Sequence, residues 1–391
     1  MTGRAVHFGA GSIGRGFLGQ IYCESGYQTT FIDVVKPVVD ALNLRGAYPL
    51  HEVSDEGGRT LVIDRVNAVD GSDIEAASTA LAAADIASTA VGLHALPHIA
   101  PVIAAAIVRR FSRNDAPPLD IIVCENLKNG EAHMRALVAA HLEKNHLPLL
   151  ETRVGFVEAS IGRMVPVVTP EQRAEDPLAV WVEPYCELPV DVRGFRGPVP
   201  ELRYLKPASN FAAYVERKLF VHNLTHAATA YLGYRRGYRF IYEAIRDASV
   251  RASVEAAGRE SCAALVKKYG TGAGDVEAHR QDLILRYHNR ALADRVDRVG
   301  RDPERKLGPE DRLIGAMRLC LGQGVVPEAV AKAVAAAILY DNPEDPAVPK
   351  IQSLIRDGGV DAVLQDICGL SADSSEAAMI RAAVQSMMSD I

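Results

Sequence analysis

The sequence has little cysteine, no long apolar run and no excess of basic residues. Its six cysteines are scattered, with no C-x-x-C pair among them, so they predict reduced thiols in a cytoplasmic protein, without a disulfide framework or a zinc site. No apolar run approaches the roughly 18 residues of a membrane span. The net charge of −6, without a long basic run, argues against a nucleic-acid partner. We therefore expect no metal, no nucleic acid and no membrane among the partners of this chain.

The length and composition predict a soluble protein of more than one domain. At 391 residues the chain is too long for one ordinary core. It is 48% hydrophobic and 24% charged, which is typical of soluble globular proteins. Met1 leads almost directly into a predicted strand at Ala5–Phe8, which leaves no room for a signal peptide. We expect a cytoplasmic monomer or small homo-oligomer.

The first forty residues have the pattern of a dinucleotide-binding unit. The strand at Ala5–Phe8 runs into the glycine-rich motif Gly9–Gly14, and residues 15–25 have helical periodicity. A second strand, Thr29–Ile32, ends at Asp33. This order of strand, G-x-G-x-x-G, helix, strand and acid is the nucleotide-binding fingerprint. A glycine-rich motif alone would be a weak signal, and both strands and the acid strengthen it.

Each glycine of this motif has a predicted role. Gly9 permits the tight turn, Gly11 lets the backbone approach a pyrophosphate, and Gly14 lets the helix pack close to the sheet. Asp33 can accept hydrogen bonds from a ribose diol and would repel an added phosphate, so it favours NAD over NADP. The predicted cofactor-binding residues are Gly9, Ala10, Gly11, Ser12, Ile13, Gly14, Asp33, Val91 and Gly92.

Later strands bring further polar residues to the same edge. A strand at 85–91 ends at Gly92, and Leu119–Cys124 is followed by Glu125 and Asn126. Ligands of open α/β sheets lie beyond the carboxyl ends of the strands, so Asn126 is a candidate to reach a substrate or nicotinamide. Capping of a predicted helix over 131–137 is an equally good interpretation of Asn126.

The rest of the first half predicts smaller elements and a domain boundary. We expect a strand at Thr152–Val157 and a loop at Ile161–Pro166. Residues 179–183 and 187–191 resemble short strands of an added extension, for which antiparallel pairing is one option. The texture changes near residue 200, which predicts an α/β domain over 1–200 and an all-helical domain over 201–391. Predicted helices of the second domain lie at about 240–269, 275–288, 311–321, 328–339, 350–356, 360–367 and 375–388.

One helical stretch of the second domain carries a candidate reactive group. In Lys218–His226 a spacing of 100° per residue places Asn223 about 140°, and His226 about 80°, round from Lys218. A lysine among the apolar residues of this stretch can be partly desolvated, which would disfavour its ammonium form and suit a general base. An amide and an imidazole beside it can bind one substrate oxygen. The alternative is a surface lysine, a helix-capping asparagine and a core histidine.

A second stretch concentrates basic residues. Arg295–Leu307 contains five of them in a loop-like sequence. A charge run of this kind is usually a solvated face. The alternative is a clamp for an anionic substrate, because arginine forks match phosphate oxygens. The predicted substrate-binding residues are Arg298, Arg301, Arg305 and Lys306.

These motifs together resemble the polyol-specific long-chain dehydrogenase/reductase family over nearly the whole chain. The residues that carry the resemblance include His7–Phe17, Ser88–Gly92, Cys124–Leu127 and the motif K-x4-N-x2-H at Lys218–His226. The resemblance implies a metal-independent oxidoreductase in which Lys218 is the general base. It further implies that Asn126 and Asn223 hold the substrate oxygen and that His226 orients it. Family members commonly have an acid directly before Arg163, where this chain has Gly162.

The resemblance also indicates the substrate class. It implies NAD-dependent interconversion of mannitol 1-phosphate and fructose 6-phosphate. A sugar-acid pair such as altronate and tagaturonate (or mannonate and fructuronate) would use the same basic stretch through its carboxylate. The alternative from another class is a non-catalytic NAD-binding regulatory protein. The complete set of candidate catalytic residues argues against it, because a pure sensor would not need them: Lys218, Asn223, His226 and Asn126.

Overall fold

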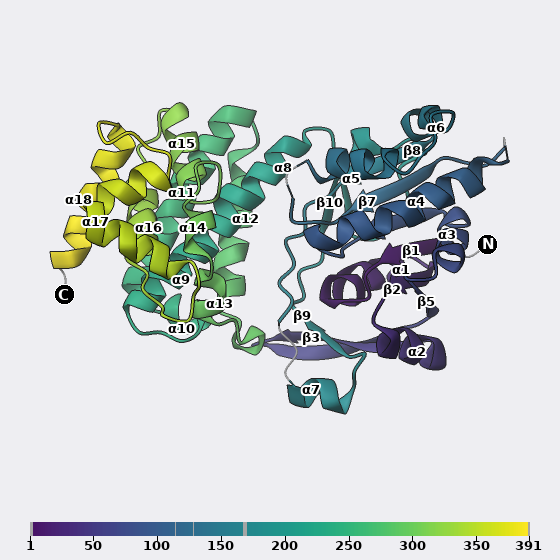
Figure 1. Ribbon diagram of the computed structural model, residues 1–391. Helices are drawn as coiled ribbons and strands as arrows, with labels where there is room; N and C mark the ends of the chain where they lie inside the picture. The colour runs from purple at the N-terminus through teal and green to yellow at the C-terminus, as the bar shows by residue number, and fades with distance from the viewer. Residues whose placement is uncertain (1–2, 114, 128, 167–169, 390–391) are drawn as a thin grey trace. The chain divides into compact units, whose positions relative to one another are not determined.

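The computed structural model describes residues 3–113, 115–127, 129–166 and 170–389. The chain divides into two compact units, Met1–Phe211 and Ala212–Ile391. The first is an α/β unit, and the described part of the second is built from helices and their connections (Figure 1). The division falls later than the boundary predicted near residue 200, because strand β11 (Leu205–Ala208) pairs with β10 (Leu188–Asp191) of the first unit.

A parallel sheet forms the centre of the first unit. In the described residues its order is β5-β2-β1-β6-β7-β8. The strands are β1 (Arg4–Phe8), β2 (Gln28–Asp33), β5 (Val66–Asp70), β6 (Ile86–Thr89), β7 (Leu119–Val123) and β8 (Val154–Glu158). The chain adds β2 and β5 on one side of β1 and then β6, β7 and β8 on the other. The strand order therefore reverses between β1 and β6, and ligands of open α/β sheets bind outside the carboxyl ends of the strands at such a point.

Both faces of this sheet are covered, which explains why β6 and β7 are buried throughout. On one face the apolar residues of the strands pack with α3, α4, α5 and α6. On the other they pack with the helical segment η1–α1 and with β10. These elements span α3 (Ile74–Ala82), α4 (Leu96–Phe111), α5 (Gly130–Ala139), α6 (Leu147–Thr152), η1 (Gly14–Leu18) and α1 (Gly19–Glu24).

Smaller sheets extend the first unit. Strands β3 (Tyr48–Ser54) and β4 (Gly57–Ile63) form an antiparallel hairpin, and β9 (Val180–Val182) pairs with β3 in parallel. Strands β10 and β11 are also parallel. Strands β9 and β10 correspond to the two predicted extension strands, so the antiparallel option was wrong for both of these ladders. The hairpin itself was not predicted. The remaining elements here are α2 (Lys36–Arg45), η2 (Leu93–Ala95), α7 (Pro170–Glu175) and η3 (Val192–Gly194).

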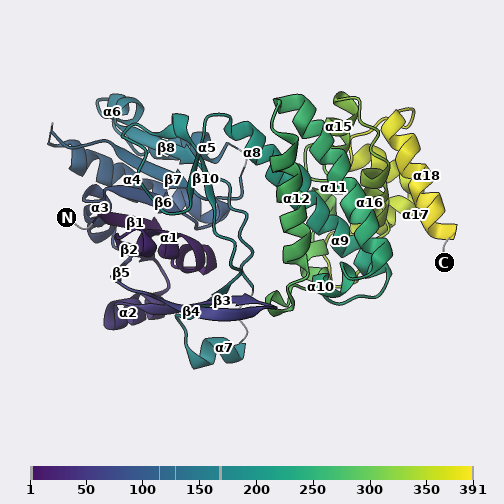
Figure 2. The same ribbon diagram turned by 180° about the vertical axis from the view of Figure 1, so that it is seen from behind.

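The second unit packs around helices α9, α11 and α16, which lie side by side in both ribbon views (Figures 1 and 2). Most residues of α16 are buried, as the alanine-rich sequence predicts for a core helix. The helices are α8 (Phe211–Arg217), η4 (Lys218–Asn223), α9 (Leu224–Arg235), α10 (Ile241–Ala244), α11 (Ala248–Tyr269), α12 (Ala273–Tyr287), η5 (Arg290–Leu292), α13 (Val296–Gly300), α14 (Pro303–Lys306), α15 (Ile314–Gly322), α16 (Glu328–Ile338), α17 (Val348–Asp366) and α18 (Ser375–Ser389).

Several boundaries in this unit differ from the prediction for local reasons. The helix predicted over 240–269 is divided into α10 and α11, because the Asp247 carboxylate caps α11 by accepting hydrogen bonds from the backbone of Ser249 and Val250. The helix predicted from Asp311 begins at Ile314. Helix α17 contains Gly359 at φ 70° and ψ −165°, which accounts for the break predicted between 356 and 360.

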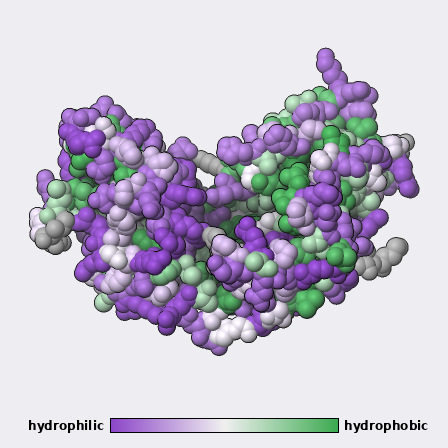
Figure 3. Space-filling model, turned by 60° about the horizontal axis from the view of Figure 1, so that its bottom comes forward, coloured by the Kyte–Doolittle hydropathy of each residue, from purple (hydrophilic) through white to green (hydrophobic). Residues whose placement is uncertain are grey.

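One face of the molecule is mostly polar. Hydrophilic residues predominate on the face in Figure 3, and hydrophobic residues occur there in separate groups on both units. Within the described ranges, no helix combines the length and apolar character needed to cross a membrane.

Candidate functional site

The glycine-rich motif lies at the point where the strand order reverses. Gly9 has φ +99°, and a Cβ atom there would lie 2.7 Å from the carbonyl oxygen of Ala90. A Cβ on Gly14 would overlap with the carbonyl oxygen of Gly9, whereas a Cβ on Gly11 would meet open space. The turn therefore requires glycine at its first and last positions. Its middle position leaves room for a ligand to approach the backbone.

Asp33 fastens this turn to the end of β2. One carboxylate oxygen accepts a hydrogen bond from the backbone N–H of Ala10 at 2.6 Å, and the other accepts from Val35 at 2.8 Å. An ionised carboxylate has about four lone-pair positions, so both oxygens can still accept from ribose hydroxyls. The next side chains along the chain, Val34 and Val35, are 72% and 50% exposed, and Leu93, beyond β6, is also largely exposed. These apolar surfaces suit a nucleotide base.

Arg15 supports the same turn from behind and was not identified from the sequence. Its Nε donates to the carbonyl oxygen of Ala10 at 2.7 Å, and its Nη1 donates to the carbonyl oxygen of Leu178. Arg15 lies in η1, whose residues form a π-helical turn. Such turns occur often at functional sites. The arginine therefore links the glycine-rich motif to the segment before β9.

Glu125 holds the second predicted cofactor loop. Its two carboxylate oxygens accept hydrogen bonds from the backbone N–H groups of Val91 and Gly92, each at 2.9 Å. The loops after β6 and β7 are thus joined at the carboxyl edge, where Asn126 follows directly. Asn129 occupies the N-cap position of α5, so the helix-capping interpretation of Asn126 was wrong. The sequence placed Glu125 at this edge, but its role as an anchor depends on the adjacent strand.

A pair of carboxyl groups lies at the end of the next strand. Glu158 is the last residue of β8, in register with Val123 of β7. Burial raises the pKa of Glu158 to about 7, and the nearby carboxylate of Glu131 acts in the same direction. Gly162 occupies the position where the family resemblance predicts an acid, and Arg163 after it is buried and donates to the carbonyl oxygens of Glu183 and Gly16. These hydrogen bonds join the loop after β8 to η1 and to the segment after β9.

In the second unit, the stretch predicted as one regular α-helix contains a π turn. Residues Lys218–Asn223 form η4, between α8 and α9. A π turn bonds residue i to i+5, so Lys218 and Asn223 lie closer to one line along the helix than the roughly 140° of an α-helix. The spacing predicted from 100° per residue was therefore wrong in detail. The change brings the lysine and the amide nearer to the same side.

Cationic and potentially cationic groups surround this turn. His222 is buried, and burial together with the Arg286 guanidinium and the His226 and Lys218 side chains holds its pKa well below the usual range. The His222 carbonyl oxygen accepts a hydrogen bond from the Tyr287 hydroxyl at 3.0 Å. Such surroundings disfavour a further positive charge.

His226 is held on two sides. Its Nε2 lies 2.9 Å from Oδ2 of Asp294, and its ring stacks on Tyr287 with centroids 5.1 Å apart and an interplanar angle of 10°. The other oxygen of Asp294 accepts hydrogen bonds from Nε and Nη2 of Arg298, at 2.9 and 2.6 Å. Burial opposes ionisation of Asp294, but the hydrogen bond from His226 and the charge of Arg298 hold its pKa below the usual value. Asp294 was not identified from the sequence.

The basic stretch is helical, which corrects the loop prediction. Helices α13 and α14 contain much of it, and several of its arginines form ion pairs within the chain. Arg305 pairs with Asp302 and Asp311. Arg301 is exposed, and the described residues offer its side chain no ion pair. Lys306 is 4% exposed, and burial, reinforced by Arg312 and Arg305, lowers its pKa to about 7.

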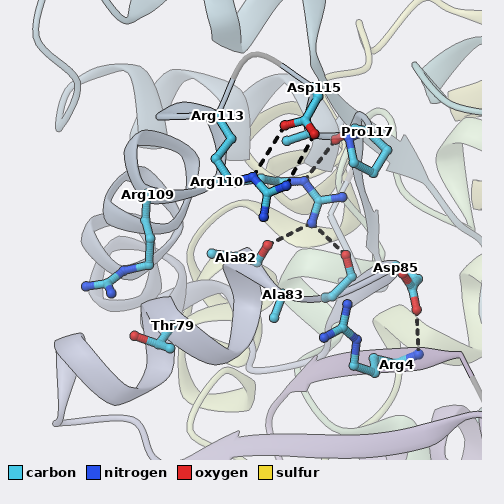
Figure 4. A pocket seen from close by; sticks show the side chains of 12 residues that line it. Arg4, Thr79, Ala82, Ala83, Asp85, Arg109, Arg110, Arg113, Asp115 and Pro117 are labelled. Carbon is cyan, nitrogen blue, oxygen red and sulfur yellow. Dashed lines mark hydrogen bonds and ion pairs between the residues drawn. The ribbon is translucent and has the colours of Figure 1, made fainter.

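A pocket of about 510 Å³ lies at the opposite, amino-terminal edge of the large sheet (Figure 4). Arg110 spans it and donates to the carbonyl oxygens of Ala82 and Ala84, at the end of α3, and of Pro117. Arginine at a helix C-terminus satisfies carbonyl groups that lack helical partners. Arg110 therefore has a structural explanation, and none of the predicted site residues lines the pocket. The described residues contain no cluster of three or more His, Cys, Asp or Glu that could hold a metal ion.

The chain matches models of one family in both units. The mannitol dehydrogenase Rossmann domain matches residues 3–204, and the mannitol dehydrogenase C-terminal domain matches residues 210–388. A mannitol-1-phosphate 5-dehydrogenase of Bacillus licheniformis is 39% identical over 372 residues, covering 95% of this chain and 97% of that protein. The enzyme of the same name from Geobacillus thermodenitrificans is 40% identical over 369 residues, covering 94% of each.

Solved structures have the same fold. Pseudomonas fluorescens mannitol 2-dehydrogenase, in a ternary complex with NAD and D-mannitol, matches with a TM-score of 0.76 and 20% identity, covering 100% of this chain and 92% of that one. A substrate-free D-sorbitol dehydrogenase matches with a TM-score of 0.77 and 16% identity, covering 97% and 91%. The predicted fold, a Rossmann-type sheet unit followed by a helical unit, is confirmed.

Proposed function

Because the chain belongs to the mannitol dehydrogenase family, we propose that it catalyses the NAD-dependent oxidation of mannitol 1-phosphate to fructose 6-phosphate. The observation that carries this assignment is the match to proteins of that activity at 39% identity over 95% of the chain. The family models match residues 3–204 and 210–388, so they include the nucleotide-binding motif and the Lys218 stretch together. The reverse reaction, reduction of the ketose phosphate, uses the same groups.

The carboxyl edge of the first unit fits NAD. The open space at Gly11 and the N–H groups of the turn suit the pyrophosphate. Asp33 would accept hydrogen bonds from the ribose diol while it keeps the turn in place, and Val34 offers an exposed apolar surface to the base. The cofactor, when bound, supplies a hydride acceptor. The loop at Val91 and Gly92, anchored by Glu125, completes the proposed cofactor site.

The proposed chemistry uses one base and several hydrogen-bonding groups. Neutral Lys218 removes the hydroxyl proton of the polyol as the carbinol carbon gives up hydride. The π turn supports this role, since it turns Asn223 towards the side of Lys218. Amide N–H groups of Asn126 and Asn223 stabilise the developing alkoxide, the kind of stabilisation that usually contributes most to catalysis. His226 orients the same oxygen or its neighbour.

The basic stretch supplies the proposed phosphate anchor. Arg298, Arg301, Arg305 and Lys306 all lie within α13, α14 and their junction. Lys306, with a pKa of about 7, would take up a proton when a phosphate dianion binds beside it, because an opposite charge favours the ammonium form. We further propose a cytoplasmic monomer or small homo-oligomer, in keeping with the six free cysteines.

An absorbance assay of NADH formation tests this function. Mannitol 1-phosphate, mannitol, altronate and mannonate are each offered with NAD, and fructose 6-phosphate with NADH in the reverse direction. We expect kcat/KM for mannitol 1-phosphate to exceed that for each of the others by at least about 100-fold, ~2.7 kcal/mol. Preference for an aldonate would assign the basic stretch to a carboxylate. No turnover with any compound would refute the enzymatic assignment.

A further inference from the structure

Asp294 joins two residues to which the proposed function gives separate tasks. One carboxylate oxygen lies 2.9 Å from Nε2 of His226, and the other accepts two hydrogen bonds from Arg298. The Asp294 side chain is 8% exposed, against 43% for that of Arg298. A buried carboxylate with both oxygens occupied is rigid, so it can set the positions of both partners.

The contact determines which nitrogen of His226 carries hydrogen. An ionised carboxylate only accepts hydrogen bonds, so Nε2 must donate to it. A neutral imidazole has a single N–H, which leaves Nδ1 as an acceptor. No hydrogen bond from the described parts of the chain reaches Nδ1, and the ring is held flat against Tyr287. His226 is therefore prepared to accept a hydrogen bond from a substrate hydroxyl.

The same carboxylate orients the Arg298 guanidinium. Nε and one hydrogen of Nη2 are used on Asp294, which leaves the Nη1 hydrogens and the second Nη2 hydrogen for another anion. A guanidinium fixed along one edge loses less side-chain entropy when it binds through the other. Arg298 lies on α13, four residues after Asp294, so the ion pair also ties this helix to the segment that precedes it.

We propose that Asp294 is a positioning residue of the reaction, which fixes the Nε2–H tautomer of His226 and aims Arg298 at the anionic end of the substrate. The proposal rests on the roles given above to His226 and Arg298. It predicts that the hydroxyl-accepting nitrogen and the anion anchor depend on one group. Neither Asp294 nor its link to both residues follows from the general lysine mechanism.

Asp294→Asn tests the positioning role because it removes the negative charge while the side chain keeps its size. The amide oxygen is the group that Arg298 can use, so the NH2 group is turned towards His226 and favours the Nδ1–H tautomer. Nε2 of His226 is then the acceptor and faces the new amide group, while Nδ1 carries the hydrogen and cannot accept a hydrogen bond from the substrate. We expect kcat to fall about 10- to 100-fold, the range for losing one charge-assisted hydrogen bond, and KM for mannitol 1-phosphate to rise less.

The control is Asp361→Asn, which removes the same charge from an ion pair with Arg381 on the surface of the same unit. It should leave kcat and KM within about twofold of wild type, since two-fold is ~0.4 kcal/mol. Melting temperature and NADH binding are measured for both variants. A loss of activity that follows melting temperature in both variants would indicate a merely structural role and overturn the proposal.

The direct test is the tautomer of His226 in the wild-type protein, read from side-chain ¹⁵N shifts of histidine-labelled enzyme, with His226→Gln to assign the signal. The proposal requires Nε2–H in wild type. An Nδ1–H or doubly protonated ring at pH 8 would overturn it even if Asp294→Asn failed to fold. If wild type turned over polyol phosphate but Asp294→Asn kept kcat within twofold, the positioning role would fail and the proposed function would stand. Absence of wild-type turnover would refute the function, and the ¹⁵N shifts would still decide the tautomer.

Discussion

Replacing Lys306 with methionine should stabilise the helical unit, and the gain should disappear as pH rises. Lys306 is 4% exposed, and its pKa is lowered to about 7, first by burial and then by Arg312 and Arg305. A free lysine titrates near 10.4. Below pH 7 both the folded and unfolded states carry the proton, so the cost of burying the charge is present in full. Between pH 7 and about 10.4 the folded state has lost the proton that the unfolded state keeps, and the cost declines.

The size of the effect follows from this shift. Roughly three pKa units at 1.36 kcal/mol each give about 4 kcal/mol of destabilisation at pH 6. Imperfect packing of methionine should cost ~1 to 2 kcal/mol. We therefore expect Lys306→Met to raise the free energy of unfolding by about 2 to 3 kcal/mol at pH 6, and to lie within ~1 kcal/mol of wild type at pH 9.5.

Urea unfolding followed by far-UV circular dichroism measures this change in the helical unit. Trp181, the only tryptophan in the sequence, lies in β9 of the first unit, so its fluorescence follows that unit separately. The control is Lys332→Met on α16, an exposed lysine, which should show no such pH-dependent gain. The reasoning is refuted if Lys306→Met is no more stable than wild type at pH 6, or if its advantage does not decline with pH.

Three further predictions concern the cofactor, metal independence and the phosphate anchor. Asp33→Ala should narrow the preference for NAD over NADP, measured as the ratio of kcat/KM values, and should weaken NAD binding because the Ala10 N–H loses its acceptor; equal use of both cofactors by wild type would exclude the ribose role of Asp33. Activity should survive prolonged EDTA treatment, and a loss restored by added zinc would overturn the lysine mechanism. Arg301→Ala should raise KM for mannitol 1-phosphate at least about 10-fold, ~1.4 kcal/mol, and more than Arg305→Ala, whose guanidinium is already paired with Asp302 and Asp311; KM values within twofold of wild type for both would exclude this anchor.

The fold, and the glycine-rich turn that we propose as part of the cofactor site, could be predicted because they depend on local sequence. Gly9 and Gly14 are required by a turn only six residues long, and Asp33 is the last residue of its strand. Helix α16 was predicted from its own composition and is buried as expected. In each case the evidence lay within one or two neighbouring elements.

The anchors of the site could not be predicted, since they join residues distant in sequence. Glu125, in the loop after β7, accepts hydrogen bonds from the backbone of Val91 and Gly92 in the loop after the neighbouring strand β6. Asp294 meets His226 from a segment 68 residues later. The π turn at Lys218–Asn223 has no periodic signal distinct from an α-helix, so the angular argument from 100° per residue could not detect it. The basic stretch was predicted as a loop because it is rich in charged residues and its two helices are very short. Helices of this length are shorter than the window of about 11 to 18 residues over which helical periodicity can be recognised.

The measurement that tests the central claim most directly is the kcat of Lys218→Ala for oxidation of mannitol 1-phosphate. If Lys218 is the base, kcat should fall by at least about 10³-fold, ~4 kcal/mol, while NADH binding, assigned to the first unit, stays at the wild-type value. Lys332→Ala, at an exposed position of the same unit, should leave both unchanged. A Lys218→Ala enzyme that keeps more than a tenth of wild-type kcat, a barrier change below ~1.4 kcal/mol, would contradict the mechanism and leave His226 as the next candidate for the base.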